Sequence, residues 1–228
     1  MAAVTRQDLR FAVPLYTIPE AARLLGVPTS TFDEWTRQGT AGRRRGLVTT
    51  VRGSSRGPAV PFVGLVEGMV AAAFRRAGVS MQHIRKSLAA IESTIGLEHA
   101  LASRKLYTDG AAIVYDYAHQ EDDDEVLAVV VSGQRIFSPI VSDYLRRITY
   151  ADDQFATRLV LPITREPLIV ADPKRAHGRP LFLRGGAPME DVIDRFRAGE
   201  SFRSVARDFE LKPEDVEEVI RVSLPAAA

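Results

Sequence analysis

The chain has 228 residues, of which 46 % are hydrophobic and 26 % charged, and it contains no cysteine. This composition is typical of a globular protein with one or two cores, and it excludes disulfides and thiolate metal sites. No apolar run approaches the roughly 18 residues that a membrane-spanning helix needs, and the first residues lack the apolar core of a signal peptide. We therefore expect a cytoplasmic protein.

The formal net charge of +1 conceals a strong asymmetry along the chain. Residues 1–60 hold nine Lys and Arg residues against four Asp and Glu residues, whereas residues 105–160 hold five against ten. A basic head joined to acidic or neutral parts is typical of a DNA-binding domain that carries a protein-binding body.

Residues 16–39, YTIPEAARLLGVPTSTFDEWTRQG, predict two short helices joined by a tight turn. Apolar residues recur at helical spacing in the first helix, which ends at Gly26. In the second helix, 29–38, Phe32 and Trp35 lie three residues apart on the inner face. This pattern is that of a helix-turn-helix DNA-binding motif, and a plain helical hairpin is the alternative.

The segment from Thr36 to Val66 contains no Asp or Glu but has six arginines. Its β-forming run 47–51 and its second extended piece 59–62 are separated by turn-forming residues, which predicts a β-wing beside the helix pair. Arginines on a wing suit phosphate oxygens, which dominate the affinity for DNA, and a solvated basic loop is the alternative. The predicted DNA-binding residues are Ser30, Thr31, Arg37, Arg43, Arg44, Arg45, Arg52 and Arg56.

The N-terminal part resembles the winged helix of MerR-type regulators over about residues 15–92. The family pattern is met by Tyr16, Gly26-Val27, Thr31-Phe32, Trp35, Gly39, Phe74–Ser80 and Ile84-Arg85. The chain departs from it at Asp33, where the family usually carries an arginine facing DNA, and at Pro28, where it usually has a hydroxyl cap. Because Asp33 and Glu34 would repel phosphates, more of the predicted binding falls to Ser30, Arg37 and the wing.

Two further helices, over 62–77 and 81–95, are predicted after the wing, each with one apolar stripe. Helix pairs at this position commonly join two subunits, so these stripes are candidates for a homodimer interface. The C-terminal helices are a second candidate for that interface. The alternative is that both stripes close the core of their own domain.

Residues 105–163 are predicted to form a small α+β segment. Its expected elements are strands at 112–117, 127–131 and 157–163 and a helix at 142–147. The acidic run 121–125 offers oxygen ligands for a divalent cation, but no spaced ligand loop surrounds it. A solvated loop is the favoured interpretation, and we predict no metal and no cofactor.

Residues 164–228 predict two short strands followed by three helices. The expected strands are 168–170 and 181–183, and the expected helices are 188–198, 202–209 and 213–222. The three helices form a second unit of helix-turn-helix shape. Its last helix exposes Glu214, Asp215, Glu217 and Glu218, which a major groove would repel, so we expect this unit to bind protein or to dimerise.

This C-terminal part resembles a small bacterial domain family of VapB-like antitoxins that are paired with PIN-type ribonuclease toxins. The resemblance covers about residues 165–222 and departs from the family at 184–187. The matching residues are Val170–Pro173, Gly178–Pro180, Ala198–Ser201 and Val205–Phe209. Together with the winged helix, it implies a homodimeric VapB-type antitoxin that binds double-stranded DNA at its own operator, represses its operon and neutralises a PIN-type toxin.

The resemblance also implies that the toxin holds Mg²⁺ with clustered carboxylates, to which an arginine fork can bind bidentately. Arg179 and Arg184, on either side of the second short strand, are the predicted toxin-binding residues. The alternative is that these arginines are solvated or ion-paired within their own domain.

No enzyme is predicted, because the four histidines lack metal-binding spacing and the chain has neither a nucleophile elbow nor a P-loop. Two other interpretations stay open: a MerR-like regulator that senses a small molecule through residues 105–228, and an enzyme or recombination factor that is targeted by the winged helix. The predicted fold class is α+β, mainly α. Its expected domains are a winged helix with a helical extension (1–104), a middle segment (105–163) and an antitoxin-type three-helix domain (164–228).

Overall fold

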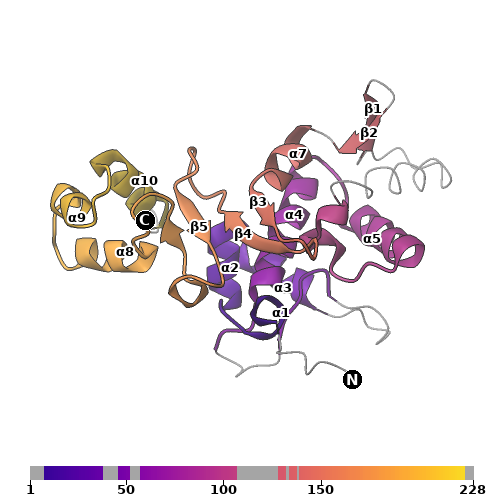
Figure 1. Cartoon of the computed structure of the whole chain (residues 1–228), viewed down its shortest axis with the longest axis horizontal. Coiled ribbons are helices and arrows are strands. Elements are labelled where there is room, and N and C mark those ends of the chain that lie inside the picture. Colours follow the sequence, from indigo (N-terminus) through magenta and orange to yellow (C-terminus); the bar gives the residue numbers. More distant parts are fainter. Residues whose placement is uncertain are drawn as a thin grey trace.

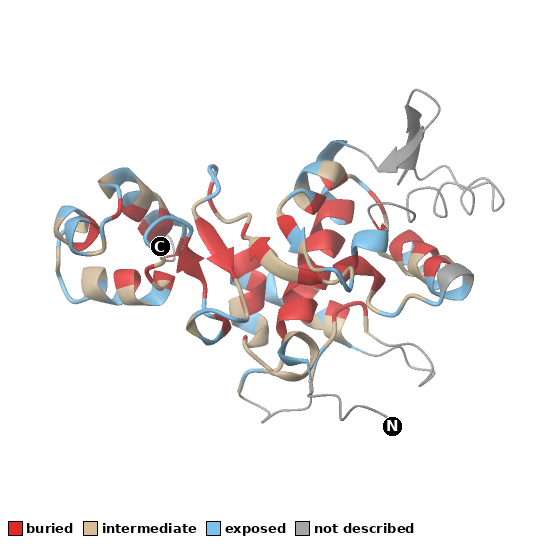
Figure 2. Cartoon of the chain, viewed as in Figure 1, coloured by how far each residue is buried: buried red, intermediate tan, exposed pale blue. Residues whose placement is uncertain are grey.

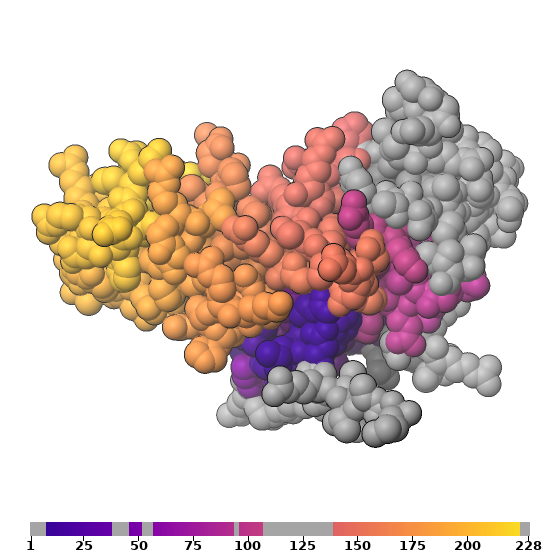
Figure 3. Space-filling model, in the orientation of Figure 1, coloured from indigo at the N-terminus to yellow at the C-terminus, as the bar shows by residue number. Residues whose placement is uncertain are grey.

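The computed structural model describes residues 8–37, 46–51, 57–106, 128–131, 134–137 and 139–223. Within these ranges the chain is mainly helical with a four-stranded antiparallel sheet, which confirms the α+β, mainly α fold class. The molecule is elongated: the sheet lies in the middle, most helices lie on one side of it, and the last three helices lie on the other (Figure 1, Figure 3).

The larger half is built around α4 (Phe62–Arg76). Every residue of α4 from Phe62 to Phe74 is buried, so this helix is covered on all sides (Figure 2). The elements that contact it include α1 (Leu9–Ala12), α2 (Ile18–Leu25), α5 (Met81–Ile95), η1 (Ala100–Ala102) and α7 (Pro139–Leu145). The α4 stripe therefore closes the core of its own chain and is not free to form a dimer interface.

The helix pair α2 and α3 (Thr29–Thr36) has the predicted helix-turn-helix arrangement. The Thr17 hydroxyl and the Glu20 carboxylate form a capping box at the start of α2, and Gly26 ends α2 in the left-handed conformation with φ 63°. An added Cβ on Gly68 of α4 would lie 2.5 Å from the Phe32 ring, so glycine lets α3 approach α4 closely.

The expected wing strands are not regular strands in the described residues. The Val48 N–H donates to the Trp35 carbonyl at 3.0 Å, so the start of the run 47–51 bonds to the end of α3 instead of to a partner strand. One backbone bond, from the Val51 N–H to the Ala59 carbonyl at 2.8 Å, closes the base of the predicted wing.

The middle of the chain contributes a hairpin, a helix and two strands. The hairpin strands β1 (Ala128–Val131) and β2 (Gln134–Phe137) pair antiparallel, and α7 packs on α4. The strands β3 (Ile148–Tyr150) and β4 (Ala156–Val160) follow. The predicted strand 112–117 and the acidic run 121–125 lie outside the described residues.

The central sheet has the order β3-β4-β5-β6, where β5 is Ile169–Ala171 and β6 is Leu181–Phe182. Its register aligns Leu159 with Ala171 and Ile169 with Phe182. Its first two strands lie before residue 164 and its last two after it, so the sheet joins the middle segment to the C-terminal one. The predicted strands 157–163, 168–170 and 181–183 are confirmed, each within about three residues.

The last three helices are α8 (Met189–Arg197), α9 (Phe202–Asp208) and α10 (Pro213–Ser223), as the sequence predicts. Their shared core includes Val192, Val205 and Val216, which are fully buried. The Ser201 side chain caps α9 by accepting from the Ser204 N–H. Unlike the helices of the larger half, these three helices do not surround a central buried helix.

The turn between β5 and β6 holds the two halves together. The Tyr16 hydroxyl, just before α2, donates to the Gly178 carbonyl at 2.6 Å, and burial raises the pKa of this phenol above its ordinary value. The Leu15 side chain packs where a Cβ on Gly178 would lie. The sheet and the C-terminal turn therefore dock directly onto the helix-turn-helix half.

Candidate DNA and protein interfaces

The outer face of α3 carries the polar residues that the sequence predicts. Ser30, Glu34 and the following Arg37 are exposed, and Thr31 is partly exposed. Phe32 and Trp35 point into the core at 0 % and 2 % exposure. The division into an apolar inner face and a polar outer face is that of a recognition helix.

Arg37 is paired with the acid that breaks the MerR pattern. Its Nη2 lies 2.5 Å from Asp33 Oδ2 across one helical turn, and the Arg37 side chain is 73 % exposed. An exposed pair of this kind contributes little stability, about 0–1 kcal/mol. Arg37 can therefore exchange the Asp33 carboxylate for a phosphate at small cost, but Asp33 remains a nearby negative charge.

Five of the six predicted arginines of this region lie outside the described residues: Arg43, Arg44, Arg45, Arg52 and Arg56. The described residues next to these arginines have defined positions. A Cβ on Gly46 would lie 2.6 Å from the Thr36 carbonyl oxygen, so residue 46 packs against the end of α3. The described residues on both sides of Arg43–Arg45, Arg37 and Gly46, therefore lie at the end of α3.

A buried polar cluster behind α3 was missed by the sequence analysis. Glu67 of α4 is 3 % exposed, and its carboxylate accepts the Thr49 N–H at 2.6 Å and lies 2.9 Å from His99 Nδ1. His99 Nδ1 also lies 3.0 Å from the Thr49 hydroxyl. A lone carboxylate inside an apolar helical run could have signalled it, because a buried charge requires partners.

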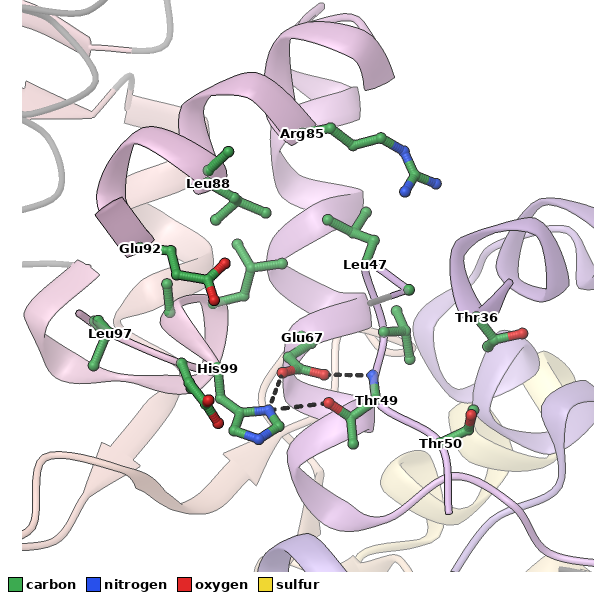
Figure 4. Close-up of a pocket in the computed structure, with 16 residues that line it drawn as sticks. Thr36, Leu47, Thr49, Thr50, Glu67, Arg85, Leu88, Glu92, Leu97 and His99 are labelled. Carbon is green, nitrogen blue, oxygen red and sulfur yellow. Dashed lines mark hydrogen bonds and ion pairs between the residues drawn. The ribbon is translucent and has the colours of Figure 1, made fainter. Parts of the chain in front are cut away.

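This cluster lies in a pocket of about 710 Å³ between the wing base, α4 and α5 (Figure 4). Thr36, Leu47, Thr49 and Thr50 line one side, and Arg85, Leu88 and Glu92 of α5 line the other. The pocket is therefore adjacent to the helix-turn-helix motif, not in residues 105–228.

Arg179 precedes β6 along the chain and Arg184 follows it, and the structure gives the two arginines different surroundings. Arg179 Nη1 lies 3.4 Å from Asp191 Oδ1, with both side chains about half exposed. Arg184 is exposed and has no hydrogen bond or ion pair within the described part of the chain. It follows Leu183, which is 39 % exposed, and precedes two glycines with positive φ.

The turn that carries Arg184 is compact. Gly185 and Gly186 have φ values of 73° and 72°, which other residues rarely adopt, and the Arg175 guanidinium lies against Gly186. Leu183 and Arg184 therefore form an exposed apolar and cationic tip, with a second cation beside it.

The exposed face of α10 is acidic, as predicted. Glu214 and Glu217 are exposed, whereas Asp215 and Glu218 are partly covered. Glu218 accepts the Arg165 N–H at 2.7 Å, and Glu217 pairs with Arg221 at 3.7 Å. The acids that remain on the surface would repel a phosphate backbone.

The described residues contain no helix long and apolar enough to cross a membrane. They also contain no group of three or more His, Asp or Glu side chains arranged to hold a metal ion.

Comparison with known proteins matches both ends of the chain to families. Residues 14–88 match a family described as "Putative DNA-binding HTH domain", and residues 169–221 match "Protein of unknown function (DUF433)". The first match contains α2, α3 and α4, and the second contains β5, β6 and the last three helices.

The whole chain also has a close relative. It is 39 % identical to the Mycobacterium tuberculosis protein named "Putative antitoxin VapB45", over 96 % of this chain and 98 % of that protein. The crystal structure of Rv2018 from Mycobacterium tuberculosis superimposes with a TM-score of 0.81 at 40 % identity, over 93 % of this chain and 100 % of that chain. The chain thus belongs to the family of VapB-type antitoxins and carries a helix-turn-helix DNA-binding domain.

Proposed function

We propose that this antitoxin acts in the cytoplasm as a two-partner binding protein and not as an enzyme. Its N-terminal helix pair binds the operator of its own operon and represses it, and its C-terminal part binds and neutralises a PIN-type ribonuclease toxin. The observation that carries this proposal is the presence of two helix-turn-helix-shaped units whose outer faces differ in charge. The family membership supports the antitoxin role.

The DNA-binding part of the proposal rests on α3 and the residues after it. Ser30, Thr31 and Arg37 meet the major groove and its phosphates, and the arginines from Arg43 to Arg56 contact the backbone. One such unit discriminates poorly between sequences, so we infer a two-fold homodimer on half-sites about one helical turn, or a multiple of it, apart. Since α4 is buried, α5 or the C-terminal helices supply the dimer interface.

The toxin-binding part rests on the tip at Leu183 and Arg184. Arg184, which has no partner among the described residues, can give its whole fork to carboxylates of a toxin, whereas Arg179 must first leave Asp191. We therefore rank Arg184 above Arg179. The exposed Leu183 beside it supplies the apolar contact that desolvates such an ion pair.

Co-expression with the neighbouring toxin gene, followed by purification through a tag on the antitoxin and a ribonuclease assay, tests the proposal. We expect a stable complex that cleaves no RNA. Arg184→Ala should weaken toxin binding by about 2 kcal/mol or more, and Arg179→Ala by less than about 1 kcal/mol. Arg221→Ala on α10 is the matched control and should bind as the wild type does. A toxin that binds Arg184→Ala at wild-type affinity would refute the assignment of Leu183 and Arg184 as the toxin-binding residues.

A further inference from the structure

The pocket behind the helix-turn-helix has the size and lining of a small-molecule site. Its volume of about 710 Å³ falls in the range of roughly 300–1,000 Å³ that is usual for such sites. Its apolar lining comes from Leu47 and Val48 at the wing base and from Leu88, Leu97 and Leu101 on the opposite side.

The helix α5 presents two different faces to its surroundings. Ile84, Ser87 and Ile91 are buried in the core. Arg85, Leu88, Ala89 and Glu92 follow the spacing i, i+3, i+4, i+7 and line the pocket (Figure 4). A basic and an acidic residue therefore stand at the two ends of an apolar helical stripe, about 10 Å apart at 1.5 Å per residue.

These two charged residues have no internal role in the described structure. Neither the Arg85 guanidinium nor the Glu92 carboxylate has a hydrogen bond or ion pair within the residues that the structure describes. By contrast, the third charged group of the pocket, Glu67, is held by Thr49 and His99. The Arg85 and Glu92 side chains on α5 are therefore available to a ligand, whereas Glu67 forms part of the pocket wall.

The balance of charge favours a cation. Three carboxylates, those of Glu67, Glu92 and Glu98, line the pocket together with one arginine and His99, which lies against Glu67. The rest of this half of the molecule is basic. Anionic ligands and DNA phosphates would be repelled by this lining.

We propose that this pocket binds a small organic molecule with an apolar body and a protonated amine. The amine pairs with Glu92, the apolar body lies over Leu47 and Leu88, and a hydrogen-bond acceptor at the far end meets Arg85. This site is separate from the proposed toxin-binding tip and lies next to the wing base. Since Thr36 and Thr50 also line it, occupancy changes the affinity for DNA, and DNA changes the affinity for the ligand by the same factor.

A fluorescence titration of the full-length protein with monodansylcadaverine tests the site. This probe joins an apolar ring and sulfonyl oxygens to a primary amine. We expect saturable binding with increased emission. Glu92→Gln, which removes the charge at constant shape, should weaken binding about tenfold, and Ala89→Trp, which fills the pocket, should abolish saturation. Glu217→Gln on α10 is the matched control and should bind the probe as the wild type does.

Three results would overturn the proposal. They are equal binding of the neutral N-acetylated probe, wild-type affinity of both pocket variants, and fluorescence that rises without saturating. Duplex DNA binding by each variant without the probe verifies that it is folded. Saturating probe that leaves the dissociation constant for promoter DNA unchanged would refute the link to the wing base.

Discussion

The two helix-turn-helix-shaped units of this chain, α2–α3 and α9–α10, share a shape but not a surface. Both have a hydroxyl cap at the start of the first helix, at Thr17 and at Ser201. The second helix of the N-terminal unit exposes Ser30, Glu34 and the paired Arg37, whereas the exposed charged residues of α10 are mainly carboxylates. We therefore infer that the charges on the outer face of the second helix, and not the backbone motif, determine what each unit binds.

The two units are also held in place differently. The N-terminal pair packs on the fully buried α4, with Phe32 against Gly68. In the C-terminal unit, Arg195 of α8 pairs with Glu200 before α9 and with Asp208 at its end, partly in solvent. Core substitutions should therefore lower the stability of the first unit most, and surface ion pairs should contribute more to the stability of the second.

The largest expected effect is on stability. Phe32→Ala removes a ring with 0 % exposure from the contact between α3 and α4, and it should lower the free energy of unfolding by about 3–5 kcal/mol. Val216→Ala, its counterpart in α10, removes two methyl groups and should cost about 2 kcal/mol. Urea unfolding of both variants measures the difference. Equal losses would show that the N-terminal unit is not the more tightly packed one.

The next effect concerns the affinity for DNA. Arg44→Glu combined with Arg45→Glu should weaken binding to all duplex sequences alike and reduce the slope of log K against log salt by about 1.8. Arg203→Glu with Arg207→Glu, on the C-terminal helix α9, is the matched control and should leave that slope unchanged. If the control pair reduces the slope and the first pair does not, the assignment of the two units is reversed.

A smaller effect of opposite sign is expected at Asp33. Asp33→Asn removes a negative charge from the recognition helix and releases Arg37, so the affinity for DNA should rise about two- to fivefold. Asp194→Asn breaks a similar helical pair, with Arg197 at 3.2 Å, in α8 and should not change DNA binding. Weaker DNA binding by Asp33→Asn would show that the pair itself positions Arg37 on the phosphates.

The smallest effect is a difference in response to pH. Hydrogen bonds from Arg195 lower the pKa values of Glu200 and Asp208, whose ordinary values are 4.5 and 3.8. Their contribution to stability is thus complete above these values and is lost as the pH falls through the lowered folded pKa values. Burial raises the pKa of Glu20 in the N-terminal unit, so its contribution is present below 4.5 and is lost as the pH rises through the raised value.

Urea unfolding between pH 3 and pH 7 separates these contributions. Arg195→Met should make the loss of stability below pH 4.5 shallower. Glu20→Gln should favour the folded state more at pH 7 than at pH 4, although it also alters the capping box. If Arg195→Met leaves the loss of stability in acid unchanged, that loss belongs to other carboxylates. Candidates are Asp8 and Asp153, whose pKa values Arg10 lowers.

Much of the helical fold could be predicted from the sequence because its signals are local. The helix 81–95 agrees with α5 at both ends, and the three C-terminal helices agree within about a residue. The wing strands could not be predicted correctly, because Val48 and Thr49 bond to Trp35 and Glu67, partners that only the tertiary fold supplies. The strands β2 and β3, of four and three residues, were missed because such short runs carry little periodicity.

The contacts of the candidate sites also divide into those that follow from local sequence spacing and those that depend on the tertiary fold. The pair between Asp33 and Arg37 follows from their spacing along a helix and could have been predicted. The pair between Arg179 and Asp191 depends on how β6 meets α8, so the sequence could not distinguish Arg179 from Arg184. The pocket was missed because its lining comes from five separate segments of the chain.

The assignment of one partner to each unit is tested most directly by measuring both affinities on the same protein samples. Ser30→Glu on α3 and Arg184→Glu beside β6 each place a negative charge on one exposed position. With circular dichroism unchanged, we predict that Ser30→Glu loses promoter DNA and keeps the toxin, and that Arg184→Glu loses the toxin and keeps DNA. The opposite pattern, or loss of both partners in either folded variant, would contradict it.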